Sequence, residues 1–347
     1  MRTPRSRPAR LAGALLAGLA LITACGTPGD PAATETKATA STSATALPAA
    51  EGSTSYPLTL KTPFGDTTLD ERPERIAIVT ANTLDTDALI ALGGTPVFAP
   101  STVDRNPWLD KGDIADIKTL WDAEAGTEVS AESVAAASPD LIVALAAYET
   151  FDQARFDKLS AIAPVLHAAQ GDLSWQELTR KLGSTLDLSA AADKAVAAAE
   201  EKVARTREAH PEFKGKSATH VIVYDEKYGP SYASAPGSDT ALLFEQLGFV
   251  LPAEAAKFAK DDAISDELVG LVDADFLLLS TSGSPAYFVD APLVKAVPAV
   301  ADGRAVINPE DPKTSTNHFA WGLNVQSVLS VPWLIEQLAE FGAKAIR

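Results

Sequence analysis

Short apolar runs alternate with helix-like stretches along most of the chain. Residues 75–79 (RIAIV) and 141–145 (LIVAL) are apolar runs of strand length, and residues 85–92 between them have the spacing of a helix. Residues 96–99 form a further short run of strand type. Alternation of this kind is typical of parallel sheets covered by helices, so the pattern predicts an α/β fold.

The same order of elements starts again after about residue 215. A strand is expected at 220–224, a helix at 240–247 and a second strand at 276–280. At roughly 150 residues per domain, a chain of 347 residues also favours two compact units over one. We therefore expect two lobes of similar construction.

Two pairs of stretches can be aligned between the halves. Residues 130–140 match residues 265–275 at a constant offset of 135, and residues 88–93 resemble residues 243–248. In the first pair a serine stands where a helix N-cap is expected, with an acid two positions later. Coincidence is the alternative for stretches this short, but two matches in the same order favour duplication of one α/β unit.

A long helix is expected between the two halves. Residues 187–210 carry an apolar stripe on a background of Ala, Glu, Lys and Arg, and the pattern stops at His210-Pro211. A helix of some 20 residues extends about 30 Å, which is roughly the height of a small domain. The pattern predicts two Rossmann-like lobes, at 56–186 and 211–347, bridged by one stiff α-helix that permits little relative motion.

The N-terminus has the features of a secretory signal. Four arginines precede an uncharged stretch from Leu11 to Ala24, which is shorter than the roughly 20 residues that span a bilayer. Residues 21–26 (LITACG) resemble the bacterial lipobox, whose cysteine is acylated and becomes the first mature residue. We expect a lipoprotein signal peptide at 1–24 and lipidation at Cys25; a plain signal peptide with an incidental cysteine is the alternative.

Composition narrows the classes of partner. Residues 25–55 are mostly Thr, Ala, Ser, Pro and Gly, so this segment is expected to be a flexible, lipid-anchored tether. The chain has 29 Lys and Arg against 46 Asp and Glu, a net charge of −17, which disfavours nucleic acid and charge-driven binding to anionic lipid. One cysteine excludes an intrachain disulfide and any Cys-rich metal site.

Motifs of hydrolases, nucleotide-binding proteins and metalloproteases are missing from the sequence. There is no Gly-x-Ser-x-Gly, phosphate loop, dinucleotide glycine fingerprint or His-Glu-x-x-His, so neither an enzyme nor a cofactor is expected. The four histidines are scattered, and His210 and His220 have structural positions. Only His318 and His167 could contribute to a metal site, so a receptor for a bare metal ion is a minor alternative.

Polar and aromatic residues follow several of the predicted strands. Parallel α/β sheets bind ligands beyond the carboxyl ends of their strands, and in two facing lobes those ends line a cleft. Packing of each side chain onto its own lobe is an equally good interpretation of any single residue, but the set as a whole favours a binding surface. The candidate ligand-binding residues are Asn82, Thr83, Trp121, Tyr148, Tyr224, Tyr232, Ser280, Asn317 and Trp321.

Three stretches carry a resemblance to a known family. They are residues 72–77 (RPERIA), 132–143 (ESVAAASPDLIV) and 156–165 (FDKLSAIAPV). Over residues 56–341 the chain resembles the substrate-binding lipoproteins of bacterial ABC importers for iron–siderophores, cobalamin and haem. One departure is Ala137-Ser138, where the family usually has Leu-Lys. The resemblance implies a class III periplasmic binding protein anchored to the cell membrane, which delivers a ferric siderophore to a permease with a cytoplasmic ATPase.

The resemblance also implies two docking residues and a range of ligands. Glu132 and Glu245 match the surface glutamates that pair with arginines of the permease; a solvated acid on a helix face is the alternative for each. The strand-end loops hold few cations, which favours a near-neutral ferric hydroxamate such as a ferrioxamine over an anionic ligand. A haem or cobalamin receptor, an extracytoplasmic enzyme and a solute sensor without a transporter remain alternatives, and we expect a monomer.

Overall fold

The structure is a computed structural model that describes residues 47–123, 128–147, 151–169 and 171–346. The proposed signal peptide, Cys25 and most of the predicted tether lie outside these residues. All of the described residues belong to one compact unit. None of the described helices combines the length and the apolar character needed to cross a bilayer.

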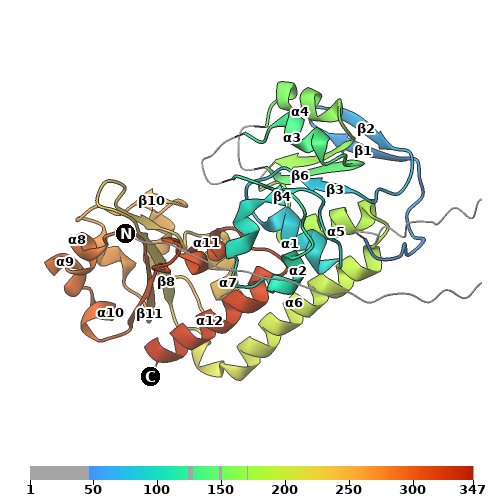
Figure 1. The fold of residues 1–347 in the computed structure, drawn as a ribbon. Coiled ribbons are helices and arrows are strands. Elements are labelled where there is room, and N and C mark those ends of the chain that lie inside the picture. Colours follow the sequence, from blue (N-terminus) through green and yellow to red (C-terminus); the bar gives the residue numbers. More distant parts are fainter. Residues whose placement is uncertain (1–46, 124–127, 148–150, 170, 347) are drawn as a thin grey trace, which may run out of the picture. The chain divides into compact units, whose positions relative to one another are not determined.

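The N-terminal lobe is built on a parallel sheet with the strand order β3-β6-β7 (Figure 1). Its strands are β3 (Ile76–Ile78), β6 (Leu141–Ala147) and β7 (Val165–Ala169). Around it lie an antiparallel hairpin, a short parallel pair and several helices: β1 (Leu58–Thr62), β2 (Gly65–Leu69), β4 (Ala99–Pro100), β5 (Leu120–Trp121), α1 (Leu84–Ala91), η1 (Ser101–Arg105), α2 (Lys111–Ile114), α3 (Ala131–Ala136), α4 (Gln153–Ser160) and α5 (Trp175–Thr185).

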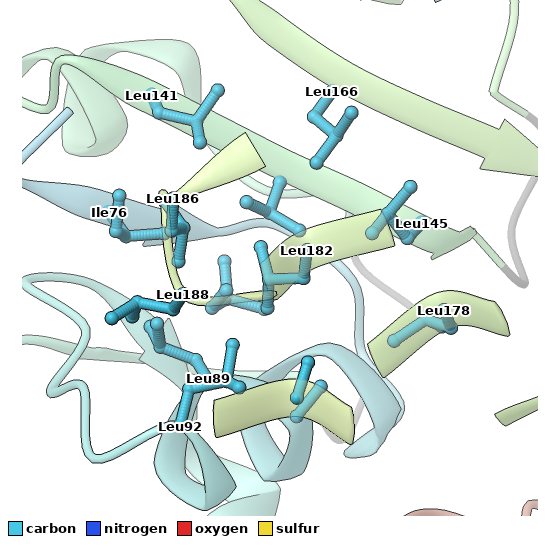
Figure 2. Packing of buried hydrophobic residues seen from close by; sticks show 14 of the residues in the cluster. Ile76, Leu89, Leu92, Leu141, Leu145, Leu166, Leu178, Leu182, Leu186 and Leu188 are labelled. Atoms are coloured by element: carbon cyan, nitrogen blue, oxygen red, sulfur yellow. The ribbon is translucent and has the colours of Figure 1, made fainter. Parts of the chain in front are cut away.

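Leucine side chains from the sheet and from two helices fill the core of this lobe. Figure 2 shows Leu141, Leu145 and Leu166 of the sheet lying over Leu89 of α1 and Leu182 of α5, all of them buried. Burying one such side chain contributes about 1.5–3 kcal/mol. The continuous apolar run in β6 is explained by burial on both of its faces.

The C-terminal lobe has a mixed sheet with the order β10-β9-β8-β11-β12. Strands β8 (Ala218–Val223), β11 (Phe276–Thr281) and β12 (Ala305–Pro309) are parallel, whereas β9 (Pro230–Tyr232) and β10 (Asp262–Ala263) run antiparallel at one edge. The helices of this part of the chain are η2 (Pro211–Phe213), α7 (Asp239–Gln246), η3 (Ala253–Lys257), η4 (Val269–Val272), α8 (Ala286–Val289), α9 (Pro292–Lys295), α10 (Pro298–Ala301), α11 (His318–Asn324) and α12 (Ser330–Ala345).

Strand β11 supplies side chains to both faces of this sheet. Phe276 and Leu278 belong to a core shared with α7 and α12, while Leu277 and Leu279 belong to a second core on the other side. Alternation of this kind follows from the two-residue period of a strand. The run Phe-Leu-Leu-Leu therefore marks a central strand that is covered on both faces.

One helix connects the lobes. Helix α6 (Ser189–Ala209) has 21 residues and runs from the N-terminal to the C-terminal lobe in Figure 1, with α12 packed along it. Its residue Ala192 belongs to the leucine core of the first lobe and its residue Val203 to a core of the second. The predicted architecture, two α/β lobes bridged by one long α-helix, is confirmed.

The aligned repeats correspond in one case and differ in the other. Helices α1 and α7 both end in Leu-Gly, and Gly93 and Gly248 both adopt the left-handed conformation that favours glycine, with φ of 77° and 98°. Ser130 caps α3 through its side chain as predicted. The matching stretch in the second lobe forms the 3₁₀ turn η4 instead of an α-helix.

The predicted end of the flexible tether, at residue 55, requires correction. Residues 47–55 lie among the described residues, and Leu47 is buried in the core of the N-terminal lobe. The Glu51 carboxylate accepts hydrogen bonds from the backbone N–H groups of Ala190 and Ala191 at 2.6 and 2.9 Å. The first turn of α6 has no side-chain cap of its own, so a distant glutamate satisfies its free donors.

Asp187 holds the rest of this N-terminal segment. Its carboxylate accepts hydrogen bonds from the backbone N–H groups of Gly52, Ser53 and Thr54 at 2.7–2.8 Å. Desolvation raises the pKa of Asp187, but the hydrogen bonds outweigh it and lower the pKa to about 2. The composition of this segment predicts a flexible tether, but hydrogen bonds from its backbone N–H groups to the Asp187 carboxylate hold it in place.

Candidate functional site

Two adjoining cavities lie between the lobes. The larger has a volume of about 720 Å³ and the smaller about 340 Å³, and Asn82 and Trp321 line both. Each is lined by residues of both lobes. Volumes in this range suit a small-molecule ligand. We call them the large chamber and the small chamber of the cleft.

The large chamber carries charges of both signs. Lys260 lies in its wall with Asp239 and Asp261. Desolvation raises the pKa of Asp239, and Lys260 opposes this effect. The remaining lining residues are polar, aromatic or apolar: Asn82, Leu84, Ala146, Gly171, Leu173, Ser174, Trp175, Tyr224, Trp321, Asn324, Val325 and Gln326.

The small chamber holds one arginine and one histidine. Arg105 and His318 line it together with Thr102, Asn106 and Thr316. Desolvation lowers the pKa of His318, and the positive charge of Arg105 lowers it further, against the opposing effect of Asp311. The imidazole is therefore neutral at pH 7, so Arg105 supplies the fixed positive charge of this chamber.

The turn from β3 into α1 builds the wall of the N-terminal lobe. The Asn82 side-chain amide donates to the carbonyl of Ala146, and its oxygen accepts from the N–H of Leu84 at 3.1 Å. Asp85 Oδ2 accepts from Thr80 Oγ1 at 2.8 Å and from the Leu145 N–H at 3.0 Å. These bonds attach the start of α1 to the carboxyl end of β6, where parallel α/β sheets place their ligands.

Three of the predicted ligand-binding residues line this cleft. Trp321 lies on α11 with 38% of its surface exposed and separates the two chambers, and Tyr224 follows β8 with 39% exposed. Asn82 lines both chambers although its polar atoms bond to its own lobe. Ligand contact by these three remains a prediction. Tyr148 lies outside the described residues.

The two other predicted aromatic residues pack into the lobes, and this part of the prediction requires correction. Trp121 is buried in a core of the N-terminal lobe and donates from Nε1 to the carbonyl of Ile78 at 3.1 Å. Tyr232 is fully buried on β9 and stacks on Phe258 with ring centroids 4.1 Å apart. Neither lines a chamber, because each side chain packs in a core of its own lobe.

The polar candidates Thr83, Ser280 and Asn317 also have structural surroundings. All three are buried, and none lines a chamber. Ser280 Oγ lies 2.9 Å from His220 Nε2, and Asn317 caps α11 by accepting from the Ala320 N–H at 2.9 Å. Thr83 is the N-cap residue of α1. Their predicted role as ligand contacts requires the same correction.

Sequence reasoning missed several residues of the large chamber. Trp175 is the first residue of α5 and stands beside the capping box of Ser174 and Glu177. This motif marks the start of a helix, and the loop before that helix follows the end of a strand. Lys260 and Asp261 lie in an irregular stretch after η3 and carry no pattern signal. Arg105 and the missed Lys260 are the two cations among the residues that line the chambers.

A further hollow of about 690 Å³ lies between α6 and α12, away from the strand ends. It carries charged side chains, but Lys202 of α6 pairs with Glu336 of α12, and Lys344 pairs with Glu340 one turn away on α12. Because these charged side chains already pair with one another, the hollow offers a charged ligand fewer partners than the cleft does. Among the described residues there is no group of three His, Cys, Asp or Glu side chains that could hold a metal ion.

A family model described as "Periplasmic binding protein" matches residues 78–312. The chain belongs to the periplasmic binding protein family. The match includes all strands of both central sheets apart from the first residues of β3, and it includes parts of both chambers. Members of this family bind substrates for transport and are not enzymes.

Curated relatives of this periplasmic binding protein include two proteins named for iron carriers. The ferric enterobactin-binding periplasmic protein FepB of Escherichia coli O6:H1 is 31% identical over 194 residues, which are 54% of this chain and 59% of FepB. The chain thus spans about three-fifths of the length of that relative. The probable siderophore-binding lipoprotein YfiY of Bacillus subtilis is 27% identical over 241 residues, 67% of this chain and 71% of YfiY.

Solved structures share the fold of this periplasmic binding protein. A periplasmic solute binding protein of Mycobacterium smegmatis has a TM-score of 0.68 at 23% identity and covers 84% of this chain and 99% of its own. PiaA of Streptococcus pneumoniae, solved in complex with ferrichrome, has a TM-score of 0.65 at 22% identity and covers 83% and 98%. At these identities the likeness supports the fold alone.

Proposed function

We propose that this protein is the extracytoplasmic substrate-binding component of an ABC importer and captures a ferric siderophore in the cleft between its lobes. Membership of the periplasmic binding protein family supports a binding role, and the names of FepB and YfiY support a siderophore as the ligand class. The cleft supports it further, because its two chambers offer space for a ligand at the strand ends of both lobes.

The balance of positive and negative charges in the cleft is the observation that favours a hydroxamate siderophore. Arg105 and Lys260 supply two positive charges and Asp239 and Asp261 two negative ones, so the lining has no net excess of cations. A buried anionic ligand needs matching cations. A ferric trihydroxamate has a neutral coordination core, whereas a ferric tricatecholate is strongly anionic. The neutral ligand fits this lining better.

The ligands named for similar proteins differ from one another. FepB is named for ferric enterobactin, and the fold neighbours include PiaA with ferrichrome and FhuD2 of Staphylococcus aureus with ferrioxamine B. These names support siderophores as a class without choosing a type. The type proposed here, a hydroxamate such as a ferrioxamine, rests on the charges of this cleft.

Titration of tryptophan fluorescence tests the proposal. Trp321 lines both chambers and Trp175 the large one, so a bound ferric siderophore would quench their emission. We expect a ferric trihydroxamate to quench at submicromolar concentration and a ferric tricatecholate to have no effect in that range. Quenching by the catecholate alone would overturn the choice of ligand, and no response to any ferric siderophore would overturn the function.

Haem is the second candidate ligand. Tyr224 and the neutral His318 line the cleft, and a phenolate or an imidazole can serve as an axial ligand of haem iron. Addition of hemin distinguishes this candidate, because an axial bond shifts the Soret band. A shift that disappears in Tyr224→Phe or His318→Ala would favour haem. Cobalamin is tested in the same fluorescence titration.

Glu132 and Glu245 are the proposed docking residues for the permease. Both are exposed, Glu132 in the first turn of α3 and Glu245 near the end of α7. The hydrogen bond from Ser130 Oγ, 2.7 Å long, lowers the pKa of Glu132 and keeps its carboxylate charged. A charged, exposed carboxylate suits an arginine of a partner, although as a surface group it adds little to stability.

Lipidation at Cys25 would hold the protein at the outer face of the cell membrane. The lipobox-like sequence around Cys25 and the word lipoprotein in the name of YfiY support this anchor. We further propose that the protein acts as a monomer, since one chain supplies both walls of the cleft. Mass spectrometry of the membrane-extracted protein would reveal the acyl chains as added mass on the peptide that begins with Cys25.

A further inference from the structure

A buried carboxyl group joins the two lobes beneath the cleft. Asp87 of α1 is fully buried, and its Oδ2 accepts hydrogen bonds from Ser327 Oγ at 2.5 Å and from Trp108 Nε1 at 2.8 Å. Ser327 lies between α11 and α12 in the C-terminal lobe, 240 residues away in the chain. The second oxygen, Oδ1, is also buried and has no hydrogen-bond partner among the described residues.

The two ends of this contact lie next to the cleft walls. Leu84, which lines the large chamber, stands on α1 one turn before Asp87. On the other side, Val325 and Gln326 line the same chamber and directly precede Ser327. Any change in the contact between Asp87 and Ser327 therefore acts directly on the separation of the two walls.

Aromatic rings close the interface around the carboxyl group. Trp108, which donates to Asp87, packs on Trp333 of α12 with ring centroids 5.6 Å apart. A Cβ atom at Gly322 of α11 would approach the ring of Trp108 to 3.4 Å. Because apolar rings and a small residue surround it, the carboxyl group has little access to water.

We propose that Asp87 is a positioning residue of the cleft, whose proton determines how firmly the wall on α1 is held against the wall that precedes α12. The protonated carboxyl is neutral and is accommodated in the apolar interface. The ionised carboxylate places an unbalanced charge there, so ionisation favours separation of the walls and entry of water. This inference concerns the mechanics of the cleft and does not depend on which ligand the cleft binds.

The groups that face the Asp87 carboxyl are uncharged. Among the described residues they are Trp108 from the loop after η1, Ser327 from the connection between α11 and α12, and the ring of Trp333, which packs at a tilt against Trp108. The acid on its own helix, Asp85, is directed to Thr80 and to the amides of β6. Desolvation accordingly raises the pKa of Asp87, and the two hydrogen bonds offset it only in part, which leaves the pKa at about 7.

The direction of the effect follows from linkage. In the packed interface the pKa of Asp87 lies above its ordinary value near 3.8, so the packed arrangement favours the protonated form. Walls that separate would hydrate the carboxyl group and restore a lower pKa. A rise in pH from about 4 to about 7 therefore weakens the contact between the walls, and a fall in pH over the same interval strengthens it.

Distance measurements between spin labels on the two lobes test the proposal in the ligand-free protein. Labels at the exposed positions Lys158 of α4 and Lys295 of α9 report on the lobes, with Cys25→Ser to remove the native thiol. We expect the distance distribution to broaden and shift when the pH rises from about 4.5 to about 7.5, which spans most of the interval between the ordinary and the raised pKa. An identical distribution at both pH values would overturn the proposal.

Two variants separate Asp87 from other titrating groups. Asp87→Asn keeps an acceptor for Ser327 and Trp108 but cannot ionise, so its distance distribution is expected to be independent of pH. Asp140→Asn is the matched control, because this carboxylate bonds within its own lobe, to the N–H groups of Glu74 and Arg75, and lines neither chamber; its pH response should equal that of the wild type. A pH response that persists in Asp87→Asn, or is lost in Asp140→Asn, would contradict the assignment.

Discussion

Asp140 and Asp275 occupy corresponding positions in the two lobes and make the same kind of bond. The Asp140 carboxylate accepts from the N–H groups of Glu74 and Arg75 at 2.9 and 2.8 Å, immediately before β3. The Asp275 carboxylate accepts from the N–H of Ser217 at 2.9 Å, immediately before β8. Each acid thus ties the start of its own central strand to the start of the neighbouring one, as expected for a duplicated unit.

Loss of either carboxylate should destabilise its lobe to a similar degree. We expect Asp140→Ala and Asp275→Ala each to lower the free energy of unfolding by about 1–3 kcal/mol, because backbone donors lose a charged acceptor. Urea unfolding followed by fluorescence measures this. The Asn variants keep an acceptor oxygen and should lose less. Equal stability of the Ala variants and the wild type would contradict the account.

Two buried acids on α1 should make stability depend on pH. Desolvation raises the pKa of Asp85 to about 6 and that of Asp87 to about 7, and hydrogen bonds offset it only in part. Their contribution to stability is therefore present at low pH and is lost as the pH rises from about 4 to about 7. Asp87→Asn should gain stability relative to wild type over this interval, by a few kcal/mol, since each pKa unit corresponds to about 1.4 kcal/mol. Unfolding curves across this pH range that run parallel for the two proteins would contradict the prediction.

The N-terminal segment should contribute to the stability of the N-terminal lobe. Deletion of residues 47–54 removes the Glu51 cap of α6 and leaves the Asp187 carboxylate without its three backbone donors. We expect a lower melting temperature for the deleted protein and for Asp187→Ala. The control is Glu71→Ala, an exposed acid of the same lobe. A flexible tether that ends at residue 55 would instead leave the melting temperature unchanged.

Trp321 and Arg105 should dominate ligand affinity. Trp321→Ala removes the wall shared by both chambers and Arg105→Ala the fixed cation of the small one, and we expect each to weaken binding about tenfold or more. Tyr228 and Lys227 are exposed and line neither chamber, so their Ala variants are matched controls. Fluorescence titration with a ferric trihydroxamate measures both sets. Equal effects of the two sets would place the ligand elsewhere.

The docking residues should affect transport without affecting binding. We expect Glu132→Ala and Glu245→Ala to reduce uptake of labelled iron by cells while the affinity of the purified protein for its ligand stays unchanged. Glu267 stands at the position aligned with Glu132 in the second lobe and is exposed, so Glu267→Ala is the matched control. Unimpaired uptake by the double variant of Glu132 and Glu245 would contradict the docking role.

The fold was predictable because its main signals are local. The apolar runs in β6 and β11 mark strands covered on both faces, and the stripe of α6 predicts a helix shared by two cores. The position of the cleft followed from the rule that parallel strands present ligands at their carboxyl ends. These signals require no knowledge of contacts between distant residues.

The details of the site depend on contacts between distant residues, which the pattern does not contain. An aromatic residue at a strand end can face the cleft, as Trp321 and Tyr224 do, or the core, as Trp121 and Tyr232 do. Asp87 is visible in the sequence as one of two acids in the first turn of α1, but its partner Ser327 lies in the other lobe. Sequence spacing alone could not pair them.

The mass of a ligand that co-purifies with the protein would identify what the cleft binds. Native mass spectrometry of the protein purified from its iron-starved host weighs the complex without a prior choice of ligand. We expect an added mass equal to one ferric siderophore of the hydroxamate type, which is lost when Trp321 and Arg105 are both replaced by alanine. An added mass of haem, cobalamin or a ferric catecholate would contradict the proposed ligand.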